Sequence, residues 1–191
     1  MTLCRSVAML VSLVLVPLTV GAAPPPEPTV EYSADSMMET EGGMTMKSRV
    51  YHTPTKQRME MGGADGSVTI IRKDKKVVWQ VMGDMYMEMP LDQSNAPDMG
   101  GFDIQEQTEV GEETVNGLKT TKTKIIATKP DGSKFGGFFW TTKEGVTVKM
   151  DLLSKDGDKK MRMASELTNV KIEKQNPALF EVPAGATKND M

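Results

Sequence analysis

Methionine is the residue type in this sequence whose number and spacing could support chemistry. The chain holds 17 methionines but only one histidine and one cysteine. Many of the methionines occur at every second position, and alternate residues of a β-strand point to the same face. Because thioethers are soft ligands that suit Cu(I), one hypothesis is a methionine-only copper site. Its candidate ligands are Met44, Met46, Met59, Met61, Met85, Met87 and Met89.

Three other interpretations of the methionines stand beside the copper hypothesis. Methionine fills irregular gaps in a core in place of leucine or isoleucine. Because its unbranched side chain specifies packing poorly, its repeated use also indicates a face that adapts to a variable apolar partner such as an acyl chain. Methionine exposed at a surface is oxidised reversibly, which would make these residues a sink for oxidants.

Other chemical groups are sparse. The single cysteine, Cys4, lies close to the N-terminus, and the single histidine, His52, precedes a Thr53-Pro54 turn. This composition excludes most nucleophile–base pairs, and the sequence has no phosphate loop, dinucleotide fingerprint or hydrolase motif. We predict His52 to be an exposed turn residue, and we expect no catalytic residues, no cofactor and no enzymatic activity.

The N-terminus has the pattern of a secretory signal peptide. Arg5 supplies a positive charge, residues 7–20 are uncharged and mostly apolar, and the small residue Ala22 precedes the expected cleavage site. A membrane anchor would need about 20 apolar residues, and Pro17 interrupts this shorter run. We therefore predict a signal peptide over residues 1–22, cleavage near Ala22, no transmembrane segment in the mature chain, and a periplasmic or secreted bacterial protein.

We predict that the mature chain forms one domain without cysteine. Residues 23–29 are rich in proline and predict a stiff tether outside the fold, followed by a single domain over residues 30–191. Cleavage removes Arg5 and changes the net charge from −3 to −4. Charges of both signs are interspersed without a basic stripe, which argues against nucleic acid as a partner. The oligomeric state is left open.

Turn signals recur about every ten residues, and apolar residues alternate with polar ones between them. The pattern predicts a mainly β, curved antiparallel meander of about ten or eleven strands with little helix, and a bend or bulge at Gly136-Gly137. A large meander curls into a half-barrel, and an incompletely covered apolar face is a site for an apolar ligand. Strand parity selects the cavity candidates Met44, Met46, Met59, Met61, Ile70, Trp79, Met87, Phe139, Met150, Leu152 and Met163.

Four segments carry a family resemblance. Residues 51–60 read Y-x-x-P-x-K-x-R-M-E, and residues 110–117, 140–145 and 177–185 follow in a recognisable order. The chain resembles the LolA/LolB-like superfamily of periplasmic lipoprotein carriers, and more closely a related domain family of unknown function that is similar to outer-membrane lipoprotein-sorting proteins. The resemblance implies a half-barrel whose concave apolar face holds acyl chains.

These observations predict a periplasmic, non-enzymatic binding protein for an apolar ligand, either a lipid or the acyl chains of a lipoprotein. It would act as a carrier or a sensor. One alternative is a methionine-rich Cu(I)-binding or oxidative-stress protein. Another is a structural or interaction module without a small ligand.

Overall fold

The computed structural model describes residues 26–63, 66–94, 103–128, 132–156 and 159–189. The predicted signal peptide and Cys4 lie outside these ranges. Within them, no helix has the length and apolar character needed to cross a membrane.

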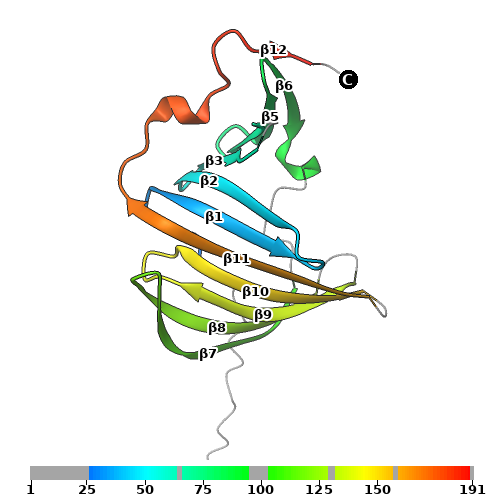
Figure 1. Ribbon diagram of the computed structural model, residues 1–191, viewed down its shortest axis with the longest axis vertical. Helices are drawn as coiled ribbons and strands as arrows, with labels where there is room; N and C mark the ends of the chain where they lie inside the picture. Colours follow the sequence, from blue (N-terminus) through cyan, green and yellow to red (C-terminus); the bar gives the residue numbers. More distant parts are fainter. Residues whose placement is uncertain (1–25, 64–65, 95–102, 129–131, 157–158, 190–191) are drawn as a thin grey trace, which may run out of the picture.

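The described residues form twelve strands in one curved sheet, and all neighbouring pairs but one are antiparallel (Figure 1). The strand order is β12-β6-β5-β4-β3-β2-β1-β11-β10-β9-β8-β7. The strands are β1 Tyr32–Thr40, β2 Thr45–Thr53, β3 Lys56–Met61, β4 Val68–Arg72, β5 Val77–Met82, β6 Met85–Pro90, β7 Asp103–Val115, β8 Leu118–Thr128, β9 Lys134–Thr141, β10 Thr147–Asp156, β11 Lys159–Ile172 and β12 Thr187–Lys188. The 3₁₀ helices within the described ranges are η1 Leu91–Gln93 and η3 Pro177–Phe180. The predicted mainly β half-barrel is therefore confirmed.

The prediction of ten or eleven strands is too low, because it misses β12. This strand has only two residues and pairs in parallel with β6, Thr187 opposite Met85. Two residues are too few to show an alternating pattern. The 3₁₀ helix η3 begins after Asn176, whose side chain accepts a hydrogen bond from the backbone N–H of Ala178 at 3.0 Å.

Local turn chemistry explains the β7–β8 hairpin. Asn116 and Gly117 have φ angles of 49° and 79°, as the two central residues of a type I′ turn require. At Gly136-Gly137 the pairing of β9 with both neighbours continues without a shift, so there is no bulge. The backbone of β10 instead comes so close that a β-carbon on Gly137 would overlap the Asp151 carbonyl oxygen. Gly137 therefore marks a close approach of two backbones, at which a side chain has no room.

Cross-strand pairs divide the sheet into two faces. On β1 to β6, one unbroken row of opposed residues is Ala34, Val50, Met59, Thr69, Gln80 and Met87. On β11 to β7, a matching row is Met163, Leu152, Gly137, Ile125 and Gln107. Thr40 pairs with Met163 and joins the two sets. We call the face that carries these rows the inner face and the opposite one the outer face.

The sheet curls toward its inner face around residues 26–29, here called the N-terminal segment. Glu27 forms an ion pair at 2.7 Å with Lys73 in the β4–β5 turn, and the Thr29 N–H donates to the Glu144 carbonyl in the β9–β10 turn at 3.0 Å. Five strands separate β4 from β9 in the sheet, so these contacts require strong curvature. The described part of the predicted tether thus contacts the β4–β5 and β9–β10 turns and remains largely exposed.

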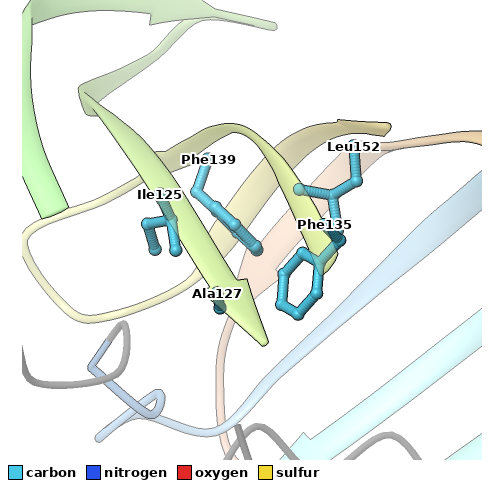
Figure 2. Packing of buried hydrophobic residues seen from close by; sticks show 5 residues of the cluster. All are labelled: Ile125, Ala127, Phe135, Phe139 and Leu152. Carbon is cyan, nitrogen blue, oxygen red and sulfur yellow. The ribbon is translucent and has the colours of Figure 1, made fainter. Parts of the chain in front are cut away.

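A buried apolar cluster lies on each face of the sheet. On the inner face, Ile125, Ala127, Phe135, Phe139 and Leu152 pack together across β8, β9 and β10 (Figure 2). On the outer face, the chain after β11 returns over β3 to β6 (Figure 1), and Phe180 packs against Ile70, Trp79 and Val81. We call residues 173–189 the C-terminal tail.

Candidate functional site

Most of the residues selected by strand parity lie together on the inner face. These are Met46, Met59, Met61, Met87, Phe139, Met150, Leu152 and Met163. Met44 lies in the β1–β2 turn, where it is 65% exposed.

The structure does not bring Ile70 and Trp79 to this face. Both lie on the outer face under Phe180, and the Trp79 indole N–H donates to Glu88 at 2.8 Å. In β4 and β5 both faces are apolar, so alternation alone does not indicate which one is inward. Their inward positions are held by Ile71 and Val78, which pair with each other.

Five further methionines share the inner face: Met38, Met82, Met85, Met89 and Met161. Met38 lies opposite Met46, and Met82 lies opposite Met85. Among the methionines that the structure describes, only Met37 and Met44 lie elsewhere. For Met85, Met89 and Met161 the signal was present in the sequence, because the Met-x-Met units of β6 and β11 place their members on one face.

Charge separates the two faces more sharply than hydrophobicity does. On β1–β6 and β9–β11, every charged side chain that the structure describes lies on the outer face. Examples are the ion pairs of Arg49 with Asp35 at 2.8 Å and of Arg162 with Asp151 at 2.9 Å. The inner face of these strands carries apolar residues with serine, threonine and glutamine between them. Such a surface accepts an apolar ligand without burying a charge.

The inner face has a closed part and an open part. The Ile125 cluster is buried, whereas four inner-face methionines remain accessible: Met82 is 45% exposed, Met85 48%, Met89 36% and Met161 61%. We call these four residues the open methionines. Three of them lie on β5 and β6, next to the edge of the sheet that is covered only by the two residues of β12.

A small cavity of about 210 Å³ lies at the end of the inner face near the N-terminal segment. Its lining residues are Pro26, Gln107, Thr121, Thr123, Phe139, Thr141 and Thr142. Binding sites for small molecules usually measure about 300–1,000 Å³. This cavity is thus too small and too polar for an acyl chain, and the open part of the inner face is the better candidate site.

His52 is buried, so the prediction of an exposed turn residue is wrong. Its ring stacks on Tyr32 with centroids 5.0 Å apart on the inner face, and its Nδ1 atom has no hydrogen-bond partner among the described residues. Burial lowers the pKa of His52, against a smaller opposing effect of a backbone hydrogen bond to Val30. Burial also raises the pKa of Tyr32 to about 12. Both rings are therefore neutral near pH 7 and close one end of the inner face.

The C-terminal tail covers the outer face of β3 to β6. The buried Arg72 guanidinium donates to Asp74 at 2.7 and 2.8 Å, to Glu181 at 2.5 Å and to the Phe180 carbonyl at 3.0 Å. The bonds from Arg72 lower the pKa of Asp74 to about 2. The tail thus occupies the outer apolar patch of this half with residues of the chain itself, and leaves the inner methionines as the accessible apolar surface.

Metal ligands of other types do not gather in the part of the chain that the structure describes, where no group of three or more His, Cys, Asp and Glu residues could hold an ion. The register sets the proposed copper ligands in rows, with Met85, Met87 and Met89 on β6 and Met59 and Met61 on β3. The copper hypothesis therefore depends on thioethers alone.

The open, curved antiparallel sheet agrees with the half-barrel that the sequence resemblance implies. No family model matches the sequence, and no curated protein matches it. Among solved structures, MucB superposes with a TM-score of 0.56 at 11% identity over 84% of this chain and 60% of MucB. The Pseudomonas aeruginosa MucA/MucB complex matches with a TM-score of 0.53 at 11% identity over 82% of this chain and 57% of the other.

A LolA superfamily protein, NE2245 from Nitrosomonas europaea, is also among the matches, with a TM-score of 0.45 at 9% identity over 83% of this chain and 93% of that protein. The chain spans about three fifths of the length of MucB. At these identities the likeness concerns the fold.

Proposed function

We propose that this chain is a periplasmic, non-enzymatic binding protein whose inner face accepts an apolar ligand, either a lipid or the acyl chains of a lipoprotein. The observation that carries the proposal is the separation of charge. On β1–β6 and β9–β11, the described part of the inner face is uncharged and rich in methionine, whereas the outer face is ionic and partly covered by the C-terminal tail.

The dimensions of the inner face support this proposal. The row from Ala34 on β1 to Met87 on β6 crosses five strand spacings, which is roughly 24 Å at about 4.8 Å each. One leaflet of a bilayer has an apolar depth of about 15 Å, half the thickness of the hydrocarbon core. An acyl chain laid across the strands would therefore find apolar contacts along its length, at about 0.8 kcal/mol for each buried methylene.

Methionine suits such a face for a mechanical reason. Its side chain is unbranched and polarizable, and it adapts to ligands of different shape. Met38, Met46, Met59 and Met61 are half-buried, so they remain accessible without requiring a preformed cavity.

A second candidate function is a protein-interaction module whose binding to a protein partner depends on whether the inner face holds a ligand. The likeness to MucB favours it, because MucB has been solved in complex with MucA(peri). The likeness extends to 85% of this chain with a TM-score of 0.53. In this form the chain is a sensor that changes its binding to a protein partner, rather than a carrier.

Native mass spectrometry of residues 23–191, purified from a periplasmic fraction without chelator or detergent, tests the proposal. The expected result is an adduct of an apolar molecule that organic extraction removes. An increment of copper mass would favour the metal alternative. A bare mass, together with no fluorescence change on titration with cis-parinaric acid, would contradict apolar binding.

Two adjacent positions on β1 provide a matched pair of variants. Met38 faces inward opposite Met46, whereas Met37 faces outward opposite Lys47 and is 47% exposed. Met38→Asp places a carboxylate where the ligand would cover it, and burying an unpaired charge is costly. We expect Met38→Asp to weaken parinaric acid binding at least tenfold and Met37→Asp to leave it unchanged. Equal binding by two folded variants would contradict the assignment of the inner face.

A further inference from the structure

We infer that the open methionines Met82, Met85, Met89 and Met161 are a reversible oxidation site that switches the inner face from apolar to polar. This inference rests on the proposed function, because the switch acts on binding of the apolar ligand. It assigns a modification site and a regulatory role to residues whose repetition a plain hydrophobic surface does not require.

Accessibility and location together mark these four residues. Their side chains are 36–61% exposed, while the other inner-face methionines on β1–β3, β6, β10 and β11 are half-buried. Among the inner-face methionines, an oxidant in solution therefore reaches these four first. Met82 and Met85 are directly opposed on neighbouring strands, so two oxidised side chains there would alter one continuous part of the surface.

The chemistry is a two-electron oxygen transfer from an oxidant of the hypochlorous acid class. The thioether sulfur forms a bond to the oxygen of hypochlorous acid while the oxygen–chlorine bond breaks. Sulfur is oxidised to the sulfoxide, chlorine is reduced and leaves as chloride, and the proton is released to water. Methionine sulfoxide reductases return the sulfoxide to the thioether.

The sulfoxide changes the face because it introduces a strong hydrogen-bond acceptor. On the free protein water satisfies this acceptor, since the four side chains are exposed. Under an acyl chain water is excluded, and beside the methionines the inner face of β5 and β6 offers only Val78 and Gln80, whose amide is the one side-chain donor there. Each sulfoxide that the ligand covers should weaken binding about tenfold, the usual effect of burying an unpaired polar group.

The chain contains its own control methionines. Met37 and Met44 are 47% and 65% exposed, as accessible as the open methionines, but they lie off the inner face. Oxidation at these two positions should leave ligand binding unchanged. Accessibility and position on the face can thus be separated by experiment.

The experiment compares the wild-type mature chain with two leucine variants. One replaces Met82, Met85, Met89 and Met161; the other replaces Met37 and Met44. Each protein is treated with graded equivalents of hypochlorous acid, the sulfoxides are located by peptide mass spectrometry, and the affinity for cis-parinaric acid is measured before and after treatment. A methionine sulfoxide reductase is then added.

We expect oxidant to lower the affinity of the wild type and of the Met37/Met44 variant at least tenfold, and the reductase to restore it. The four-leucine variant should keep its own starting affinity after treatment with the oxidant, because leucine forms no sulfoxide. If reduced wild type binds parinaric acid but oxidation of the four residues leaves its affinity unchanged, the switch is refuted and the proposed function stands. If reduced wild type does not bind, both are refuted.

Discussion

Replacing Gly137 with alanine tests whether the curl of the sheet depends on the close approach of β9 and β10. A β-carbon at this position would overlap the Asp151 carbonyl oxygen and lie 2.9 Å from the Cα atom of Leu152. Both obstacles are backbone atoms, so no side-chain rotation relieves the overlap and the strands must move. Overpacking of this kind costs about 1–3 kcal/mol of unfolding free energy, against a total of about 5–15 kcal/mol for a typical domain.

Urea-induced unfolding followed by tryptophan fluorescence measures this change. Trp140 lies on the same strand as Gly137 and is buried on the outer face, so it reports the integrity of β9. The matched control is Gly62→Ala, whose β-carbon would approach the Lys47 carbonyl oxygen at 3.3 Å without a left-handed backbone. We expect the control to change the unfolding free energy by less than about 1 kcal/mol. A Gly137→Ala protein within about 0.5 kcal/mol of wild type would refute the reasoning.

Three further predictions follow from the packing. Phe180→Ala, at a side chain only 1% exposed, should lower the unfolding free energy by about 3–5 kcal/mol and expose the C-terminal tail to limited proteolysis; an unchanged cleavage pattern would contradict its anchoring role. Because burial lowers the pKa of His52, the unfolded chain binds the proton more readily, so stability present above about pH 6.5 is lost as the pH falls toward the folded pKa. The unfolding free energy, measured by urea titration at about pH 7.5 and pH 5.5, should differ less between the two pH values in His52→Gln than in wild type. Equal differences in the two proteins would exclude this contribution. Replacing Met85, Met87 and Met89 with leucine should preserve parinaric acid binding within about twofold, because bulk and apolarity are kept. If the same variant instead lost the capacity to bind Cu(I) while it still bound parinaric acid, the Cu(I) alternative would be favoured.

Local features of the fold were predictable because short segments determine them. The Asn116-Gly117 turn needs two residues that tolerate positive φ, and the η3 turn needs only the Asn176 side chain and Pro177. Neither depends on a distant contact. The two-residue strand β12 was not predictable, because it exists only where the C-terminal tail meets β6.

His52 shows where local reasoning fails. Its neighbours in sequence indicate an exposed turn, yet its ring is buried, stacked on Tyr32 and hydrogen-bonded to the backbone of Val30. The covering residues come from a part of the chain that the local pattern around Thr53-Pro54 does not include. Burial is a property of the packed molecule, whereas the pattern around one residue reports only its neighbours.

The sequence by itself determined the strands, the turns and the two alternating sets of side chains, because the two-residue period of a strand is a local property of the backbone. It also determined that most methionines in Met-x-Met units would share a face. Only the tertiary structure decided which set became the inner face in β4 and β5. There both sets are apolar, and the contact of Phe180 with Ile70 and Trp79, more than a hundred residues apart in sequence, covers one set and leaves the methionine side open.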